Sequence, residues 1–173
     1  INGNGTVTGL TALPTSAMPS KSVIQEVSAI FAPYGDAGSE RGSSSSYTDT
    51  GITLSITPSS GSKILVLVEG CSFGYQSSAN TVSYFINLVS TPSGGSDTQL
   101  RETQIRFSSQ GNDTARLFDS WSMLYPHTHG LNGSTAITYK CQHKLNSATY
   151  CWARYKGSQM TLLELKPWQQ RLN

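Results

Sequence analysis

The sequence predicts an all-β domain, an antiparallel two-sheet β-sandwich of jelly-roll-like form with an extended N-terminal arm. Three observations carry this prediction. Wherever a period is visible, apolar and polar residues alternate in steps of two, which is typical of half-buried strands. Ser and Thr account for 27 and 18 of the 173 residues, and with 16 Gly they leave few strong helix formers. The alternating segments are short and are separated by turn-rich loops, as in sandwiches and barrels.

The first third of the chain contains three expected strands. Residues Ser22–Phe31 place Val, Gln, Val and Ala at alternate positions, and the polar loop 33–46 follows them. Ile, Leu and Ile alternate with Thr and Ser over Ile52–Thr57, and the turn Pro58–Ser62 ends this strand. Lys63–Glu69 contains five consecutive apolar residues, which predicts a strand covered on both faces.

The middle third adds three more expected strands. Over Thr81–Val89, Val, Tyr, Ile and Leu alternate with Ser, Phe and Asn, and the Gly- and Pro-rich segment 91–96 is a loop. Gln99–Phe107 carries two arginines and a glutamate, so we expect it to be an exposed strand. Ala115–Leu124 is a strand that holds Phe, Trp and Met.

The last third follows the loop 126–134. Ala136–His143 alternates Ile, Tyr and Cys with Thr, Lys and Gln. Ala148–Tyr155 and Met160–Leu165 are the remaining strands, and Pro167 ends the last of them. The pattern therefore predicts about nine strands and no helix of three turns.

The domain plan follows from length and from the composition of the two ends. A chain of 173 residues suits one domain with short extensions. We expect an extended arm or connector over residues 1–20, a sandwich over 21–166 and a tail over 167–173. The arm is Gly-rich and has too few apolar residues to form a core. Because the first residue is Ile rather than Met, we expect a processed product or part of a longer chain.

Charge and hydropathy exclude several classes of protein. No run approaches the roughly 18 apolar residues of a membrane-spanning helix, so no membrane insertion is expected. The net charge is only +2, which argues against a nucleic-acid partner. Charged residues make up just 13% of the chain, but an aromatic content of 9% argues against disorder.

The three cysteines do not describe a disulfide framework, because their number is odd. Cys141 and Cys151 fall opposite each other if the chain turns near Asn146, so a cross-strand disulfide between them is conceivable. The alternative is that both are buried thiols that pack as small apolar groups. Cys71 has no suggested partner, and no CxxC pair indicates a metal site.

No catalytic motif is visible, and we expect neither an enzyme nor a cofactor. The ten acidic residues are scattered, and neither a nucleophile elbow nor a phosphate-binding loop occurs. His127 and His129 are the only candidates for metal binding, with His143 close in sequence. Residues at i and i+2 of an extended segment point the same way, and in a three-fold assembly they would surround the axis. The alternative is a pair of solvated loop histidines, flanked by Pro and Gly.

Aromatic residues near loops are candidates for contacts with sugars or proteins. We single out Tyr34, Tyr75 and Tyr125 as surface-binding candidates. Trp121 and Trp152 are expected to fill the core instead.

Several segments resemble a known family. Residues 49–68, DTGITLSITPSSGSKILVLV, resemble a segment of tail-fibre-like virion proteins of tailed bacteriophages, notably marine and cyanobacterial phages. Residues 134–142 (STAITYKCQ) and 158–165 (SQMTLLEL) are similar to that family's closing strands. Residues 1–10 (INGNGTVTGL) and 22–29 (SVIQEVSA) are similar to its lead-in.

The resemblance implies the C-terminal head domain of a fibre or related appendage, a β-sandwich that is usually trimeric. It implies a homotrimer in the virion, in contact with other virion proteins, that attaches to host cell-surface polysaccharide or protein. It implies no catalytic residues, and places binding in variable loops. The sequence departs from the family in its longer tail after Leu165 and in the loop segment 126–131.

Three other functions are alternatives to attachment. A capsid decoration or structural connector of the virion is the nearest alternative. A polysaccharide depolymerase would need longer repeats and clustered carboxylates, and neither is seen. A secreted trimeric ligand of the complement or cytokine type would bring a signal peptide, and none is visible.

Overall fold

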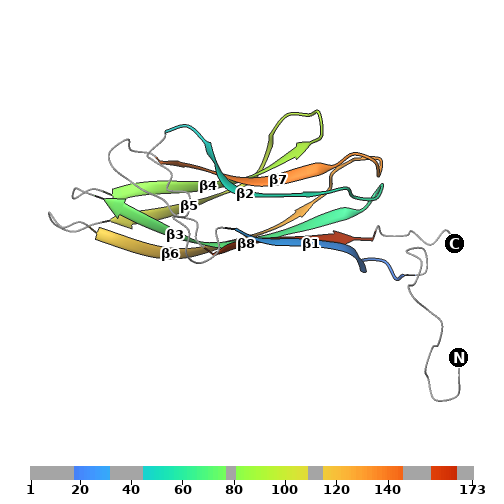
Figure 1. Ribbon diagram of the computed structural model, residues 1–173, viewed down its shortest axis with the longest axis horizontal. Coiled ribbons are helices and arrows are strands. Elements are labelled where there is room, and N and C mark those ends of the chain that lie inside the picture. Colours follow the sequence, from blue (N-terminus) through green and yellow to red (C-terminus); the bar gives the residue numbers. More distant parts are fainter. Residues whose placement is uncertain (1–17, 32–44, 77–80, 109–114, 146–156, 167–173) are drawn as a thin grey trace, which may run out of the picture.

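The structure is a computed structural model that describes residues 18–31, 45–76, 81–108, 115–145 and 157–166. These residues contain eight strands and no helix. The strands form two antiparallel four-stranded sheets stacked face to face, which confirms the predicted all-β, two-sheet class (Figure 1). The described part of the chain therefore has no helix able to cross a membrane. The strands are β1 (Val23–Phe31), β2 (Thr48–Ile56), β3 (Lys63–Gln76), β4 (Thr81–Pro92), β5 (Thr98–Ser108), β6 (Ala115–His127), β7 (Ile137–Leu145) and β8 (Ser158–Leu165).

The first sheet has the strand order β1-β8-β3-β6 and the second sheet has the order β2-β7-β4-β5. β1 pairs with β8, β2 with β7, β3 with β6 and β4 with β5, so the chain runs as if folded in half. This is the pairing that a jelly-roll-like sandwich requires. That finer description stays a prediction, as does the arm over 1–20, most of which lies outside the described residues.

The core lies between the sheets and is built from alternate residues of each strand. β8 shows the rule most clearly, because its residues are buried and half-buried in strict alternation. Burying a Val, Leu, Ile or Met side chain stabilises the fold by roughly 1.5–3 kcal/mol. The fully buried members include Ile64, Val66, Ile86, Leu88, Ile137, Tyr139, Met160 and Leu162, and Trp121 joins them as expected.

Strand boundaries differ from the expected ones mainly by extension into polar sequence. β2 begins at Thr48 rather than Ile52, because the polar residues before it pair with β7 across a register shift between Asp49 and Thr53. β3 continues to Gln76, well past Glu69, because β6 offers a partner along its whole length. The strand expected at 148–155 lies outside the described residues.

The expectation that Lys63–Glu69 is covered on both faces is wrong for this chain. Its even-numbered residues are buried, but Leu65 is only half-buried and Leu67 is 36% exposed. The physical reason is that the second sheet covers only the inner face of the first. The outer face of β3 therefore carries leucines over which the described residues place no further layer.

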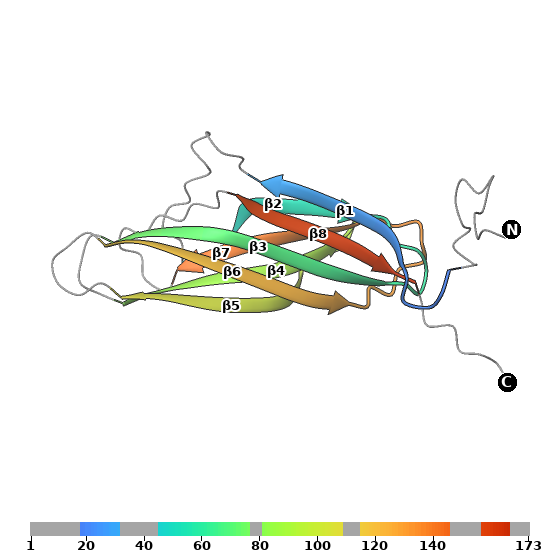
Figure 2. The same ribbon diagram turned by 90° about the horizontal axis from the view of Figure 1, so that it is seen from below.

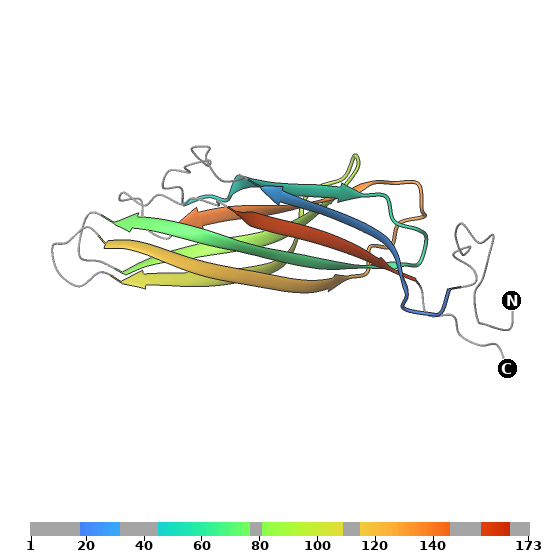
Figure 3. The same ribbon diagram turned by 60° about the horizontal axis from the view of Figure 1, so that its bottom comes forward.

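The sandwich has two distinct ends (Figures 2 and 3). At the end we call the terminal pole, the chain enters β1 and leaves β8, and the backbone of Lys166 donates to Ser22 at 2.9 Å. The connections 57–62, 93–97 and 128–136 lie there too. β1, β3, β5 and β7 all run toward the opposite end, the distal pole, and β1 stops level with Gly70, before the end of β3. Both of the longest connections, 32–47 and 146–157, follow strands that run in this direction.

Candidate functional site

The two outer faces of the sandwich differ in chemistry. On the second sheet, the ammonium of Lys140 lies 2.8 Å from a carboxylate oxygen of Asp97 and 3.6 Å from one of Asp49. The hydrogen bond to Asp97 raises the pKa of Lys140, and the same bond lowers the pKa of Asp97. Lys144 pairs with Glu102 at 3.5 Å. Charges of both signs are thus matched within the chain, as suits a face in contact with water.

The outer face of the first sheet has an apolar centre with polar residues around it, and we call it the leucine face. Cross-strand neighbours at its centre are Leu65 beside Leu163, and Leu67 beside Leu124. Leu67 is 36% and Leu124 52% exposed. A shallow groove of about 390 Å³ runs between them, with Leu67, Leu124 and Leu163 along its walls.

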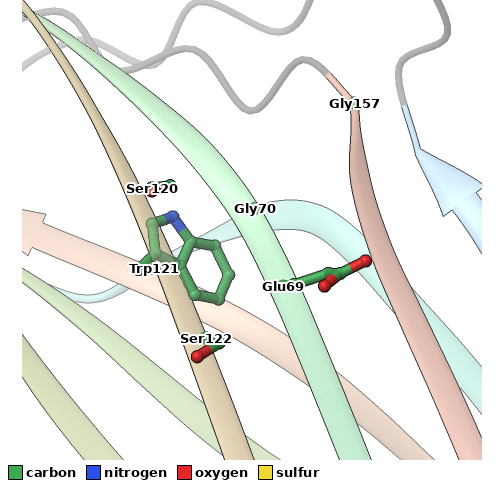
Figure 4. Close-up of a pocket in the computed structure, with 6 residues that line it drawn as sticks. All are labelled: Glu69, Gly70, Ser120, Trp121, Ser122 and Gly157. Atoms are coloured by element: carbon green, nitrogen blue, oxygen red, sulfur yellow. The ribbon is translucent and has the colours of Figure 1, made fainter.

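A second hollow of about 410 Å³ adjoins the leucine face, nearer the distal pole (Figure 4). Glu69 from β3 and the serine hydroxyls of Ser120 and Ser122 from β6 give it a polar lining. The indole of Trp121 lies against Gly70 of the neighbouring strand. A Cβ at Gly70 would meet Trp121 at 2.8 Å, so only glycine allows this approach.

Two buried polar atoms at this hollow are unsatisfied. The Trp121 Nε1 and the Ser158 Oγ find no hydrogen-bond partner in the part of the chain that the structure describes. Ser158 is completely buried and its hydroxyl lies under Gly70. Both atoms are closed off from solvent, so neither is offered to a ligand in the hollow, and the arrangement weakens the fold locally.

The two candidate metal-binding histidines are engaged by protein groups at the terminal pole. The Leu131 N–H donates to His129 Nδ1 at 3.0 Å, and His129 Nε2 lies 3.2 Å from the Ser62 hydroxyl. His127 Nδ1 lies 2.8 Å from the hydroxyl of Tyr139. Burial lowers the pKa of both histidines, helped at His127 by the charge of His129 and opposed at His129 by Glu164.

This geometry does not favour a metal. His129 has both ring nitrogens in hydrogen bonds, so it offers no free lone pair. Among the described residues, no group of three or more His, Cys, Asp or Glu side chains gathers as metal ligands would. His143 lies apart, completely buried, with its ring stacked 5.8 Å from that of Tyr84.

Ser62, His129 and Glu164 lie near one another, but they do not form a catalytic triad. Because His129 Nδ1 accepts a hydrogen bond, its proton is on Nε2, which donates to Ser62. A triad needs the opposite tautomer, with Nε2 free to take the proton of the serine. The Ser62 hydroxyl instead donates to the Ser59 carbonyl, and Glu164 accepts from the Ser59 N–H at 2.6 Å. The network ties the turn 57–62 to the loop 128–136.

The structure gives the strand pairing of two of the three candidate tyrosines. Tyr34 lies outside the described residues. The backbone of Tyr75 pairs with Arg116 near the distal end of β3, whereas Tyr125 pairs with Val66, nine residues earlier on that strand. At about 3.3 Å per residue these sites are some 30 Å apart. Tyr125 is half-buried and packs against the core, so the structure does not place it on an open binding surface.

Of the two cysteines predicted to pair, the structure describes only Cys141. Cys141 is free and completely buried in the core, and burial raises the pKa of its thiol to about 12. Cys151 lies outside the described residues, so the proposed pairing between the two stays a prediction.

The feature that sequence reasoning missed is the leucine face itself. A signal was present, because Leu65 and Leu67 in β3 and Leu163 and Leu165 in β8 occupy the positions between buried residues. Five apolar residues in a row predict a strand covered on both faces, whereas the second sheet covers only the inner face of β3.

Comparisons with known proteins add no family. No protein-family model matches the chain, and no curated protein matches it.

Proposed function

We propose that the chain is the head domain of a bacteriophage tail fibre or related appendage, a virion structural protein that attaches to the host cell surface. The observation that carries the proposal is the division of the sandwich into two poles. The chain enters and leaves at the terminal pole, where Ser22 and Lys166 are hydrogen-bonded, and the longest connections follow strands that run toward the distal pole. A rigid sandwich held at one end and presenting loops at the other suits contact with a surface.

The partners we propose are other virion proteins at the terminal pole and host polysaccharide or protein at the distal pole. Weak single contacts with a cell surface gain strength when several copies bind together. The ion-paired outer face of the second sheet is suited to solvent, as an exposed appendage requires.

We propose no catalytic role. Among the described residues, the nearest approach to a catalytic arrangement is Ser62 with His129, which has the wrong tautomer and a serine that is 1% exposed. The resemblance to fibre heads likewise implies attachment to a host and no catalytic residues.

The experiment combines cell binding with localisation. Labelled protein should bind intact cells of a host strain saturably, and excess unlabelled protein should compete. Antibodies against the chain should decorate the tail or its appendages on particles seen by electron microscopy. Release of reducing ends from host polysaccharide would show a depolymerase and overturn the proposal. Decoration of the capsid alone would show a capsid protein.

A structural connector within the virion is the second candidate. The observation that favours it is the leucine face, since apolar patches of this kind on soluble proteins mark sites of association.

A further inference from the structure

The exposed apolar side chains of the described residues gather on one face. The four large ones that remain exposed are Val23 at 48%, Ile30 at 66%, Leu67 at 36% and Leu124 at 52%. Their cross-strand partners show that all four point outward from the first sheet. The other outer face, by contrast, carries the ion pairs of Lys140 and Lys144.

The leucine face is arranged in four rows across the strands. Strand pairing aligns the outward residues from β1 through β8 and β3 to β6. Row one, nearest the terminal pole, consists of Val23, Leu165 and Lys63, and row two consists of Glu26, Leu163, Leu65 and Pro126. Row three consists of Ser28, Thr161, Leu67 and Leu124, and row four, farthest from the terminal pole, consists of Ile30, Gln159, Glu69 and Ser122.

Along β1 and β3 these rows are complementary to themselves when the order is reversed. Row one has Val23 and Lys63 where row four has Ile30 and Glu69, so reversal matches apolar with apolar on β1 and positive with negative on β3. On β8 reversal places Leu165 and Leu163 against Gln159 and Thr161. Reversal also brings Leu65 in row two against Leu67 in row three. A two-fold axis in the plane of the face and perpendicular to the strands performs this reversal, whereas an axis along the strands does not.

We propose that the leucine face binds a second copy of this chain about such a two-fold axis, with the two first sheets stacked antiparallel. Leu65 and Leu67 of one copy meet Leu67 and Leu65 of the other at the centre. Lys63 of each copy forms an ion pair with Glu69 of the other copy, once at each end of the interface. Val23 of each copy meets Ile30 of the other along the β1 side. All four exposed apolar side chains are then covered, and packed sheets about 10 Å apart allow these contacts.

The complementarity of Lys63 and Glu69 on reversal favours a second copy of this chain as the occupant. Lys63 and Glu69 lie symmetrically about Leu65 and Leu67, and binding to a different partner does not require this symmetry. Four strands about 4.8 Å apart and rows spanning about 20 Å make a face of some 300–400 Å². This is smaller than the ~800 Å² per partner of a standard interface, so the pair should dissociate on dilution. The inference does not rest on the proposed function, and the homotrimer implied by the resemblance is a competing outcome.

The experiment measures mass in solution by sedimentation equilibrium over a wide range of concentration. The full chain should dimerise reversibly. Leu67→Glu places carboxylates at the centre of the interface and should weaken dimerisation at least a hundredfold. Gln104→Glu is the matched control, because it adds a carboxylate on the other outer face, and it should leave dimerisation unchanged.

A charge exchange tests the register. Lys63→Glu and Glu69→Lys each bring like charges together twice and should each weaken dimerisation about tenfold or more. The double variant restores opposite charges and should recover most of the affinity. Circular dichroism checks that each variant is folded. A chain that stays monomeric, a trimer, or a double variant weaker than both single ones would overturn the proposal. If a monomeric chain binds cells, the proposed dimer is wrong and the proposed attachment role is kept.

Discussion

The contact between β3, β6 and β8 at Gly70 yields a prediction whose sign differs between two serines. Ser158 is completely buried and its hydroxyl has no partner among the described residues. Replacing it with Ala removes an unsatisfied polar group, whose burial costs about 1–3 kcal/mol, and opens only a small cavity. We expect Ser158→Ala to raise the free energy of unfolding by about 1 kcal/mol.

Ser62→Ala is the matched control, because Ser62 is 1% exposed but its hydroxyl is engaged. It donates to the Ser59 carbonyl at 2.8 Å and lies 3.2 Å from His129 Nε2. Its removal leaves those partners unpaired and should lower the free energy of unfolding by about 1–3 kcal/mol. The same chemical change at two buried serines is thus expected to act in opposite directions.

The contact with Gly70 extends the test to a double-mutant cycle. A Cβ at Gly70 would lie 2.4 Å from the Ser158 hydroxyl and 2.8 Å from the Trp121 ring. Overpacking of this kind costs about 1–3 kcal/mol, which exceeds the ~0.4–1 kcal/mol that Gly→Ala gains from the unfolded state. Gly70→Ala should therefore destabilise the fold, and less so when Ser158 is already Ala.

Urea unfolding followed by far-UV circular dichroism measures all four variants, with equal m-values as the check that one transition is compared. A coupling of about 1 kcal/mol between Gly70 and Ser158 is expected. The reasoning fails if Ser158→Ala destabilises as much as Ser62→Ala, or if the two substitutions at Gly70 and Ser158 are additive.

Three further predictions concern titration and reactivity. Burial lowers the pKa of His129, so the unfolded chain binds the proton more readily than the folded chain does. The free energy of unfolding should therefore fall as pH drops below about 6.5. In urea titrations, His129→Gln should flatten this dependence on pH. An unchanged slope in that variant would contradict the assignment. Cys141, with a pKa of about 12, should resist iodoacetamide in the folded chain and react after unfolding, as mass spectrometry of the peptides would show; modification under native conditions would refute its burial. Lys140→Gln breaks an exposed ion pair with Asp97 and should change the free energy of unfolding by less than ~1 kcal/mol, with a loss above 2 kcal/mol excluding this view.

The strands were predictable because their signal is local. Alternation with a period of two requires only that one face be buried, and it identifies β1, β2, β4 and β7 from neighbouring residues alone. The pairing was not predictable in this way. Which strand lies beside β3 depends on residues about 40–60 and 90–100 positions away, in β6 and β8, and on how the whole chain folds back.

The same limit explains the missed site. In β3 both Ile64 and Leu65 are apolar, so composition cannot tell which of them faces the core; the position of the second sheet decides it. In β8 the alternation set by Met160 and Leu162 carries Glu164 inward, where it is 2% exposed and accepts a hydrogen bond from the turn at Ser59. A leucine outside and a glutamate inside both follow from register, which no local pattern shows.

The mode of pairing bears directly on the role of the chain in a virion. In the antiparallel pair the terminal poles lie at opposite ends, and each copy's distal pole lies beside the other's terminal pole. Only one of the two distal poles could then face a host cell, so a dimer that resists dilution favours a connector between two parts of a particle. A monomer or a trimer with all distal poles together favours a terminal head, because parallel copies present their loops to one surface and bind it jointly. Mass in solution and cell binding, measured on the Leu67→Glu variant as well as the native chain, separate these roles: a connector loses its assembly while a head keeps its binding.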